Sequence, residues 1–325
     1  MLKVGIVGVG QFGQNHARIL SESDKCEFVG LYDWRPERAR EIAEKINAKA
    51  FESFEALISE CDALVVVVTT ISHFELAEKA LKNGIHVFIE KPITETLQQA
   101  EELLEIARND NLKIQVGHIE RFNPIVSEME DKIKDPIFME CHRIAPFTPR
   151  GTDIPVVLEL MIHDIDLILA FCKSEVKHIS ASGSGVMTKS IDIANARIEF
   201  EDGAVANITA SRISMKRSRK LRIFQKDAYF SFDFQHKKVT HIKKSAKLFK
   251  VLPKLMMGKY EGIDTKDVVD IVEVDASDRK KDALTQELES FIHAIEADIN
   301  PTVDGVAGAR ALKVALEIVE KIEKK

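Results

Sequence analysis

The sequence predicts an α/β domain built on a parallel sheet, followed by an α+β domain with a mainly antiparallel sheet. Three observations support this. The chain has 325 residues, more than a single hydrophobic core usually organises. Up to about residue 124, apolar runs alternate with amphipathic stretches, a pattern typical of βα units. Beyond that point several β-like runs follow one another without helices between them, which indicates antiparallel pairing.

The expected strands of the first domain are short and almost wholly apolar, as in strands that are buried on both faces. They are Lys3–Val7, Glu27–Tyr32, Ala63–Val68, His86–Ile89 and Lys113–Val116. Helices fit between them. Pro36 suits a first helical position, and Ser72 with Glu75 matches a capping box. We therefore assign residues 1–122 to the first domain.

The second domain is expected to span residues 123–325, with a helix over Val157–Phe171 followed by strands. These strands are Lys177–Met187, Ala194–Glu201, Ala204–Ser214, Arg219–Gln225 and Tyr229–Phe234. Glu201-Asp202-Gly203 predicts a hairpin turn between two of them. Residues 245–283 are interpreted as an irregular excursion. The chain ends in two helices, Leu284–Ala297 and Gly305–Lys325, which we expect to pack back toward the first domain.

The composition argues against a membrane-spanning, a disulfide-rich and a nucleic-acid-binding protein. The hydrophobic content of 45% and charged content of 30% are those of an ordinary globular protein, and no apolar run has the length of a membrane span. The first strand begins at once, without a signal peptide, and the four scattered cysteines form no metal or disulfide pattern. We therefore expect a cytoplasmic protein without a metal. The net charge of −6 and the lack of a known motif disfavour nucleic-acid binding.

A glycine-rich loop follows the first expected strand. Gly8-Val9-Gly10-Gln11-Phe12-Gly13 matches GxGxxG and opens an expected helix. In this arrangement Gly8 permits a tight turn, Gly10 lets the backbone approach a pyrophosphate, and Gly13 allows close helix–strand packing. The helix N-terminus supplies N–H groups and a positive dipole end. The loop predicts a dinucleotide site; the alternative is a glycine-rich turn in an unrelated α/β protein.

An acidic residue ends the second expected strand. Asp33 lies 20 residues after Gly13, where a carboxylate accepts hydrogen bonds from ribose hydroxyls. A carboxylate there repels a 2′-phosphate, which favours NAD over NADP. Arg35, two residues further on, would soften that preference.

Glu90-Lys91-Pro92 follows the fourth expected strand, at the sheet edge where open α/β proteins bind ligands. A lysine there can hydrogen-bond a substrate hydroxyl and favour a developing alkoxide. The Lys91–Pro92 bond is a candidate cis bond. The alternative is a surface Glu–Lys pair before a helix-starting proline.

The helix expected over Val157–Phe171 is apolar nearly all round and carries one polar stripe. Glu159, His163 and Asp166 stand at i, i+4 and i+7. Histidine is the usual base near neutral pH, and a carboxylate one turn away can orient it. Oxidation of an alcohol requires such a base. The alternative is a structural His–carboxylate cluster, because buried charges need partners.

Together these motifs resemble the Gfo/Idh/MocA family, which contains glucose–fructose oxidoreductase and inositol dehydrogenase. The resemblance covers essentially the whole chain. Its segments are Gly8–Gly13, Thr69-Thr70 with His73, Glu90-Lys91-Pro92, Val116–Pro124, Glu159–Asp166, Glu287–Phe291, Pro301–Gly305 and Ala309–Ala311. The Glu-Lys-Pro segment followed by a helical acid four residues before a histidine is fairly specific as a set.

The resemblance implies a Rossmann domain, then a domain with a large open, mainly antiparallel sheet whose exposed face joins subunits into a homodimer or homotetramer. It implies catalysis by Lys91 and His163, with Glu159 at a position where the family usually has Asp. The implied NAD contacts are Gly8, Gly10, Gln11, Phe12, Gly13, Asp33, Thr69, His73, Glu90 and Lys91. The implied substrate contacts are Lys91, His118, Glu120, Arg121, Asn123, His163 and Arg212.

The segments around His118, His163 and Arg212 are similar to those of a branch that oxidises the 3-hydroxyl of UDP-N-acetylglucosamine. Residues 212–254 contain 14 Lys and Arg against two acids, which would attract a diphosphate or simply solvate an edge strand. The sequence therefore predicts an NAD-dependent dehydrogenase of a nucleotide sugar. A dehydrogenase of a free polyol or sugar such as inositol, and a non-catalytic NAD sensor, stay open as alternatives.

Overall fold

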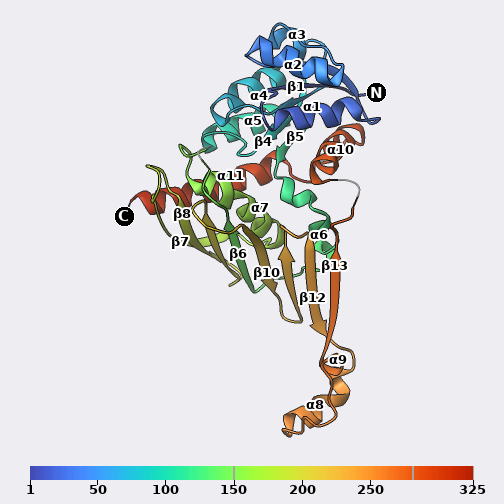
Figure 1. Cartoon of the computed structure of the whole chain (residues 1–325), viewed down its shortest axis with the longest axis vertical. Helices are drawn as coiled ribbons and strands as arrows, with labels where there is room; N and C mark the ends of the chain where they lie inside the picture. The colour runs from blue at the N-terminus through green and yellow to red at the C-terminus, as the bar shows by residue number, and fades with distance from the viewer. Residues whose placement is uncertain (149–150, 280–281, 325) are drawn as a thin grey trace. The chain divides into compact units, whose positions relative to one another are not determined.

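The computed structural model describes residues 1–148, 151–279 and 282–324 (Figure 1). The chain divides into two compact units: Met1–Phe122 with Lys281–Val314, and Asn123–Lys280 with Ala315–Lys325. The division falls within α11 (Gly305–Glu323), so this last helix contributes to both units.

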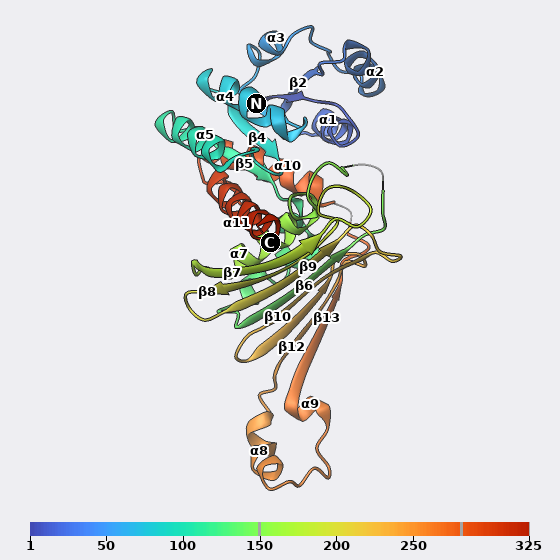
Figure 2. The ribbon, with the colours of Figure 1, turned by 90° about the vertical axis from the view of Figure 1, so that its left-hand side faces the viewer.

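The first unit is built on a parallel sheet with the strand order β2-β1-β3-β4-β5. The strands are β1 (Lys3–Val7), β2 (Glu27–Tyr32), β3 (Ala63–Val66), β4 (His86–Glu90) and β5 (Ile114–Gly117). Figure 2 shows α1 (Gly13–Glu22) and α2 (Pro36–Ile46) on one face, and α4 (His73–Lys82) and α5 (Leu97–Asn109) on the other. Both faces are thus covered, as the apolar strands predicted.

Two predicted helix starts had different outcomes. Pro36 occupies the first turn of α2, as expected. The capping box at Ser72 was wrong, because a 3₁₀ turn over Thr70–Ser72 precedes α4. Ser72 already has helical dihedrals (φ −97°, ψ −5°) and makes no side-chain cap. A capping side chain reaches the first-turn N–H groups only from an extended residue.

Helix α10 (Ala283–Glu296) belongs to the first unit although it comes from the far end of the sequence. Leu288, Phe291 and Ile292 enter the apolar cluster formed by β1, β2, α1 and α2. The ring of Phe291 lies edge-on to Phe88 of β4, with 5.9 Å between centroids. Each such buried side chain contributes about 1.5–3 kcal/mol.

The second unit contains an eight-stranded sheet with the order β13-β12-β11-β10-β6-β9-β8-β7. Its strands are β6 (Phe138–Ile144), β7 (Val176–Ser184), β8 (Ile193–Phe200), β9 (Val205–Ser211), β10 (Ser218–Phe224), β11 (Ala228–Asp233), β12 (Lys238–Lys244) and β13 (Val269–Asp275). Only β6 and β9 pair in parallel among these described strands. The predicted fold class is confirmed.

One face of this sheet is covered and the other is open. Burial alternates along β6 and β8, so every second residue enters the core. Helix α7 (Ile162–Phe171) packs on the buried face, and Figures 1 and 2 show no described helix on the opposite one. That face presents polar side chains such as Asn195, Arg197 and Thr209.

Residues 245–283 are more regular than predicted. They include β13, which pairs with β12 along its whole length, and the helices α8 (Leu248–Met256) and α9 (Thr265–Val268). Figure 1 shows α8 and α9 beyond the ends of β12 and β13. None of the helices in the described ranges is both long and apolar enough to cross a membrane.

Candidate active site

The glycine loop closes tightly between β1 and α1. Gly8 has φ +88°, and a Cβ there would lie 2.2 Å from the carbonyl oxygen of Val67. A Cβ on Gly13 would lie 1.9 Å from the carbonyl oxygen of Gly8. A Cβ on Gly10, by contrast, would meet no atom within 4 Å. The two outer glycines thus close the loop, and the middle one leaves open space at the N-terminus of α1, where a pyrophosphate fits.

Asp33 is buried at the end of β2 and joined to this loop. One carboxylate oxygen accepts the N–H of Val9 at 3.0 Å, and the other accepts the backbone N–H and Nε of Arg35 at 3.0 and 3.1 Å. Burial raises the pKa of Asp33, but these hydrogen bonds and the charge of Arg35 outweigh it, so the pKa lies below the ordinary value. The carboxylate therefore stays negative at neutral pH.

Three large apolar side chains are exposed around the same strand ends. Phe12, Trp34 and Ile71 follow β1, β2 and β3, and they are 59%, 77% and 71% exposed. Exposed apolar side chains beside a glycine loop offer a surface for a flat base. The first unit thus fits a dinucleotide on three counts: an open loop, a charged carboxylate and an apolar surface.

The Glu-Lys-Pro segment ends β4 and contains the predicted cis Lys91–Pro92 bond. Glu90 accepts the N–H of Lys91 at 3.1 Å, and its other oxygen lies 3.1 Å from Nε2 of His16 in α1. Burial raises the pKa of Glu90, but His16 and the charge of Lys91 bring it below the ordinary value. Gly117 of β5 passes alongside, where a Cβ would lie 2.9 Å from Glu90 Oε2.

His16 was missed by sequence reasoning. Its ring is buried, with Nδ1 3.2 Å from the carbonyl oxygen of Phe12. The imidazole therefore connects the glycine loop with Glu90. A polar residue three positions after Gly13, on the buried face of an amphipathic helix, is the signal that could have found it.

His73, the first residue of α4, contacts the loop that contains Pro92. Its Nδ1 lies 2.9 Å from the carbonyl oxygen of Pro92, and its Nε2 lies 3.3 Å from that of Val68. Burial lowers the pKa of His73 despite these carbonyl contacts, so the ring is neutral at pH 7 and donates its single N–H to one of the two carbonyl oxygens. The structure thus shows His73 joining two loops. Cofactor contact by His73 and by the exposed Thr69 stays a prediction.

The predicted substrate residues after β5 lie in a 3₁₀ turn over Ile119–Phe122 and just beside it. His118 and Glu120 are buried, and Arg121 reaches the carbonyl oxygen of Thr302 at 3.4 Å. Asn123 begins the second unit, and its side chain caps α6 (Pro124–Ser127) by accepting the N–H of Ile125 at 3.3 Å. The β4–β5 pairing brings His118 to the edge that carries Lys91.

In the second unit, the predicted polar stripe lies where a π-helical turn over Val157–Met161 runs into α7. Such turns are frequent at functional sites. Glu159 lies in the π turn, His163 is the second residue of α7, and Asp166 is buried one turn later. The helix predicted over Val157–Phe171 is thus confirmed, although its first turn is wider than an α-helix.

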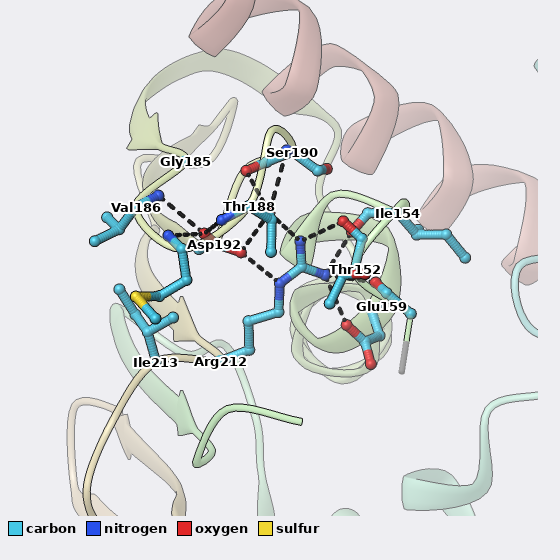
Figure 3. Close-up of polar contacts among 12 residues, drawn as sticks. Thr152, Ile154, Glu159, Gly185, Val186, Thr188, Ser190, Asp192, Arg212 and Ile213 are labelled. Carbon is cyan, nitrogen blue, oxygen red and sulfur yellow. Dashed lines mark hydrogen bonds and ion pairs between the residues drawn. The ribbon is translucent and has the colours of Figure 1, made fainter. Parts of the chain in front are cut away.

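Glu159 points to Arg212, as Figure 3 shows, with 3.1 Å between Oε2 and Nη1. The guanidinium is buried and also pairs with Asp192. Substrate contact by Arg212 stays a prediction, whereas its contacts with these two carboxylates are present in the structure. Asp192 was missed, because its partner is set by strand pairing rather than by spacing.

A second buried ion pair fixes α7 on the sheet. Arg143 of β6 makes two hydrogen bonds to Asp164, both at 2.9 Å, and both side chains are almost fully buried. Asp164 is adjacent to His163 in the sequence. The pair holds the helix that carries the predicted base in a fixed rotation.

Comparison with known proteins agrees with this geometry. Residues 2–118 match the model of the oxidoreductase family with an NAD-binding Rossmann fold, and residues 147–231 match the GFO/IDH/MocA C-terminal domain. The chain belongs to the Gfo/Idh/MocA family.

Among relatives in the Gfo/Idh/MocA family, the UDP-N-acetylglucosamine 3-dehydrogenase of Acidithiobacillus ferrooxidans is 34% identical over 99% of this chain and 97% of its own. Its solved structure superimposes with a TM-score of 0.88 over 99% and 98% of the two chains. The myo-inositol 2-dehydrogenase of Thermotoga maritima is 27% identical over 65% of this chain and 69% of its own. This Gfo/Idh/MocA protein is therefore a dehydrogenase that acts on CH–OH groups.

Proposed function

We propose that the protein oxidises the 3-hydroxyl of UDP-N-acetylglucosamine with NAD. The observation that carries this proposal is the full-length similarity to a dehydrogenase of that substrate. Lys91 and His163 supply the two groups that alcohol oxidation needs. Lys91 hydrogen-bonds the reacting hydroxyl and stabilises the alkoxide, and His163 accepts the proton. NAD, when bound, would supply the hydride acceptor.

The preference for NAD is supported by the surroundings of Asp33. Its carboxylate is charged, and both nearby arginines are engaged elsewhere: Arg35 with Asp33, and Arg38 with Val9, Gln14 and Glu41. A 2′-phosphate would meet the charged carboxylate of Asp33, while Nε of Arg35 and the guanidinium of Arg38 already have partners.

Asp33→Asn should weaken NAD binding about tenfold, which corresponds to about 1.4 kcal/mol, and should leave NADP binding equal or tighter. The substitution removes the charge that accepts the ribose hydroxyls. Trp34, the chain's single tryptophan, is adjacent and exposed, so its fluorescence should report cofactor titrations directly. Asp24→Asn, at an exposed residue, is the control. Tighter binding of NADP than of NAD by the unmodified protein would contradict the NAD preference.

The substrate is tested by incubating the protein with NAD and UDP-N-acetylglucosamine and following NADH absorbance. UDP-glucose, which lacks the acetamido group, and free N-acetylglucosamine, which lacks UDP, separate the two recognition elements. We expect kcat/KM to be highest for the complete nucleotide sugar. Equal rates with free N-acetylglucosamine would remove UDP from the recognised substrate.

A free polyol is the second candidate, supported by the similarity to myo-inositol 2-dehydrogenase. Inositol and glucose are therefore added to the same assay. A higher kcat/KM with either of them than with UDP-N-acetylglucosamine would favour the free polyol or sugar over the nucleotide sugar. The third alternative, a non-catalytic sensor, is set aside because the relative that is similar over 99% of this chain is a dehydrogenase. Assembly into a homodimer or homotetramer through the open sheet face, and a cytoplasmic location, stay predictions.

A further inference from the structure

Arg212 is a buried cation at the end of β9, with a side chain only 4% exposed. A buried guanidinium requires a partner charge. Asp192, fully buried just before β8, supplies it: Oδ1 accepts Nε of Arg212 at 2.8 Å. Because β8 and β9 are antiparallel neighbours, the start of one and the end of the other meet at the same edge of the sheet.

Asp192 is itself fixed by the turn that precedes it. Its Oδ2 accepts the backbone N–H groups of Val186, Met187 and Thr188 at 2.9, 2.7 and 2.8 Å, and Oδ1 accepts the Thr188 hydroxyl at 2.8 Å. Burial raises the pKa of Asp192, but Arg212 and these donors hold it well below its usual range. The carboxylate is therefore a permanent negative anchor.

Besides a contact of Nη2 with the Thr188 hydroxyl at 3.4 Å, the rest of the guanidinium points toward the polar turn of the helix (Figure 3). Nη1 donates to the carbonyl oxygens of Gly151 and Ile154 at 2.7 and 2.6 Å and to Glu159 at 3.1 Å. Nη2 donates to the carbonyl oxygen of Thr152 at 3.3 Å. One side chain thus joins the β7–β8 turn, the segment 151–154 and the π turn.

We infer that Arg212 is a positioning residue for the proposed proton acceptor, an inference that rests on the proposed function. Arg212, anchored by Asp192, holds the Glu159 carboxylate one helical turn before His163. Arg212 also binds the backbone of the segment 151–154. Gly151 is adapted to this arrangement: it has φ +67°, and a Cβ there would lie 3.1 Å from Glu159 Oε1. The Glu159 carboxylate reaches Arg212 at 3.1 Å from a backbone that lies in the π turn.

The charge near His163 should therefore depend on Arg212. Asp164 pairs with Arg143 of β6. Glu159 is neutralised by Arg212, which is shared with Asp192. Asp166 completes the charged groups on this helix. Loss of Arg212 removes this positive charge from Glu159, and a more negative neighbour favours a protonated imidazole.

The test measures pH profiles of kcat and kcat/KM in the full-length protein. Arg212→Gln should lower kcat about tenfold, change KM less, and move the acid limb to higher pH by about half to one unit. Arg212→Lys keeps the charge, so it should leave the acid limb in place and recover part of kcat. Glu159→Gln removes the same ion pair at the partly exposed Glu159. Because it removes a negative charge near His163, it should move the acid limb to lower pH. Lys177→Gln, at an exposed lysine on β7, is the control for charge alone.

Titration of the histidine side chains by NMR gives a readout that does not require turnover. The His163 signal is assigned by its loss in His163→Asn, and circular dichroism confirms folding of each variant. An upward shift of the His163 midpoint in Arg212→Gln, absent in Lys177→Gln, supports the inference. If His163 titrates in Arg212→Gln and in Glu159→Gln as it does in the unmodified protein, the inference is overturned. It is also overturned if Arg212→Gln unfolds and Glu159→Gln shows no downward shift. Failure of the proposed function alone would appear instead as lack of NADH formation with every sugar.

Discussion

His163→Asn should lower kcat by about 10²–10⁴-fold while NAD binding stays intact, because a positioned base contributes that much to proton transfer. The residue stands at the start of α7, directly after the π turn and beside the Arg143–Asp164 pair that fixes the helix. Asparagine retains a polar side chain of similar length but cannot accept a proton at neutral pH. Steady-state NADH formation measures the loss, and titration of Trp34 fluorescence checks the cofactor.

His178→Asn is the matched control, since His178 lies on β7 of the same unit, is exposed and contacts Ser180. It should keep full turnover. Millimolar imidazole added to His163→Ala should restore part of the rate, because the truncated side chain leaves room for a diffusible base. Near-normal turnover in His163→Asn, without any base added, would remove this residue from the chemistry and favour the structural interpretation of the helix stripe.

The parallel sheet could be predicted almost to the residue because its strands are buried on both faces. β1 and β2 have the predicted bounds, whereas β3 ends at Val66, two residues before its predicted end at Val68. Strands of the second sheet are harder, since one face is open and alternate positions are charged. The sequences of β6, β12 and β13 contain Arg143, His241 and Glu273 among apolar residues, so composition alone did not mark them as strands. Their alternation was the available signal.

The local parts of the site could likewise be predicted. The glycine loop, Asp33 and Lys91 each come directly after one strand of the parallel sheet. Their positions at the ligand-binding end of that sheet can therefore be predicted from their spacing in the sequence. Ion pairs between residues that only the tertiary structure brings together could not be predicted in this way. Arg212 was predicted to contact substrate at the start of a basic segment, but strand pairing puts Asp192 beside it and takes it into the interior. Charge counting along the sequence carries no information about such burial.

Lys91→Met should lower kcat/KM by about 10²–10³-fold, the usual cost of losing one charged donor to a developing oxyanion. Methionine keeps most of the length and apolar volume of the side chain while removing the charge. The backbone should stay in place, because Glu90 receives the N–H of residue 91 and His73 binds the carbonyl oxygen of Pro92. NAD affinity should therefore lose only what the Lys91 side chain itself contributes as one of ten implied contacts, less than about threefold or about 0.6 kcal/mol.

Lys82→Met, at an exposed lysine of α4 paired with Glu78, is the control for loss of one positive charge in the same unit. The division between kcat and KM then shows how Lys91 acts. A donor that stabilises the alkoxide affects kcat, whereas one that only binds the ground state raises KM and leaves kcat unchanged. A pure KM effect would make Lys91 a substrate-binding residue, and His163 would then have to drive the oxidation without an electrostatic partner at the reacting oxygen.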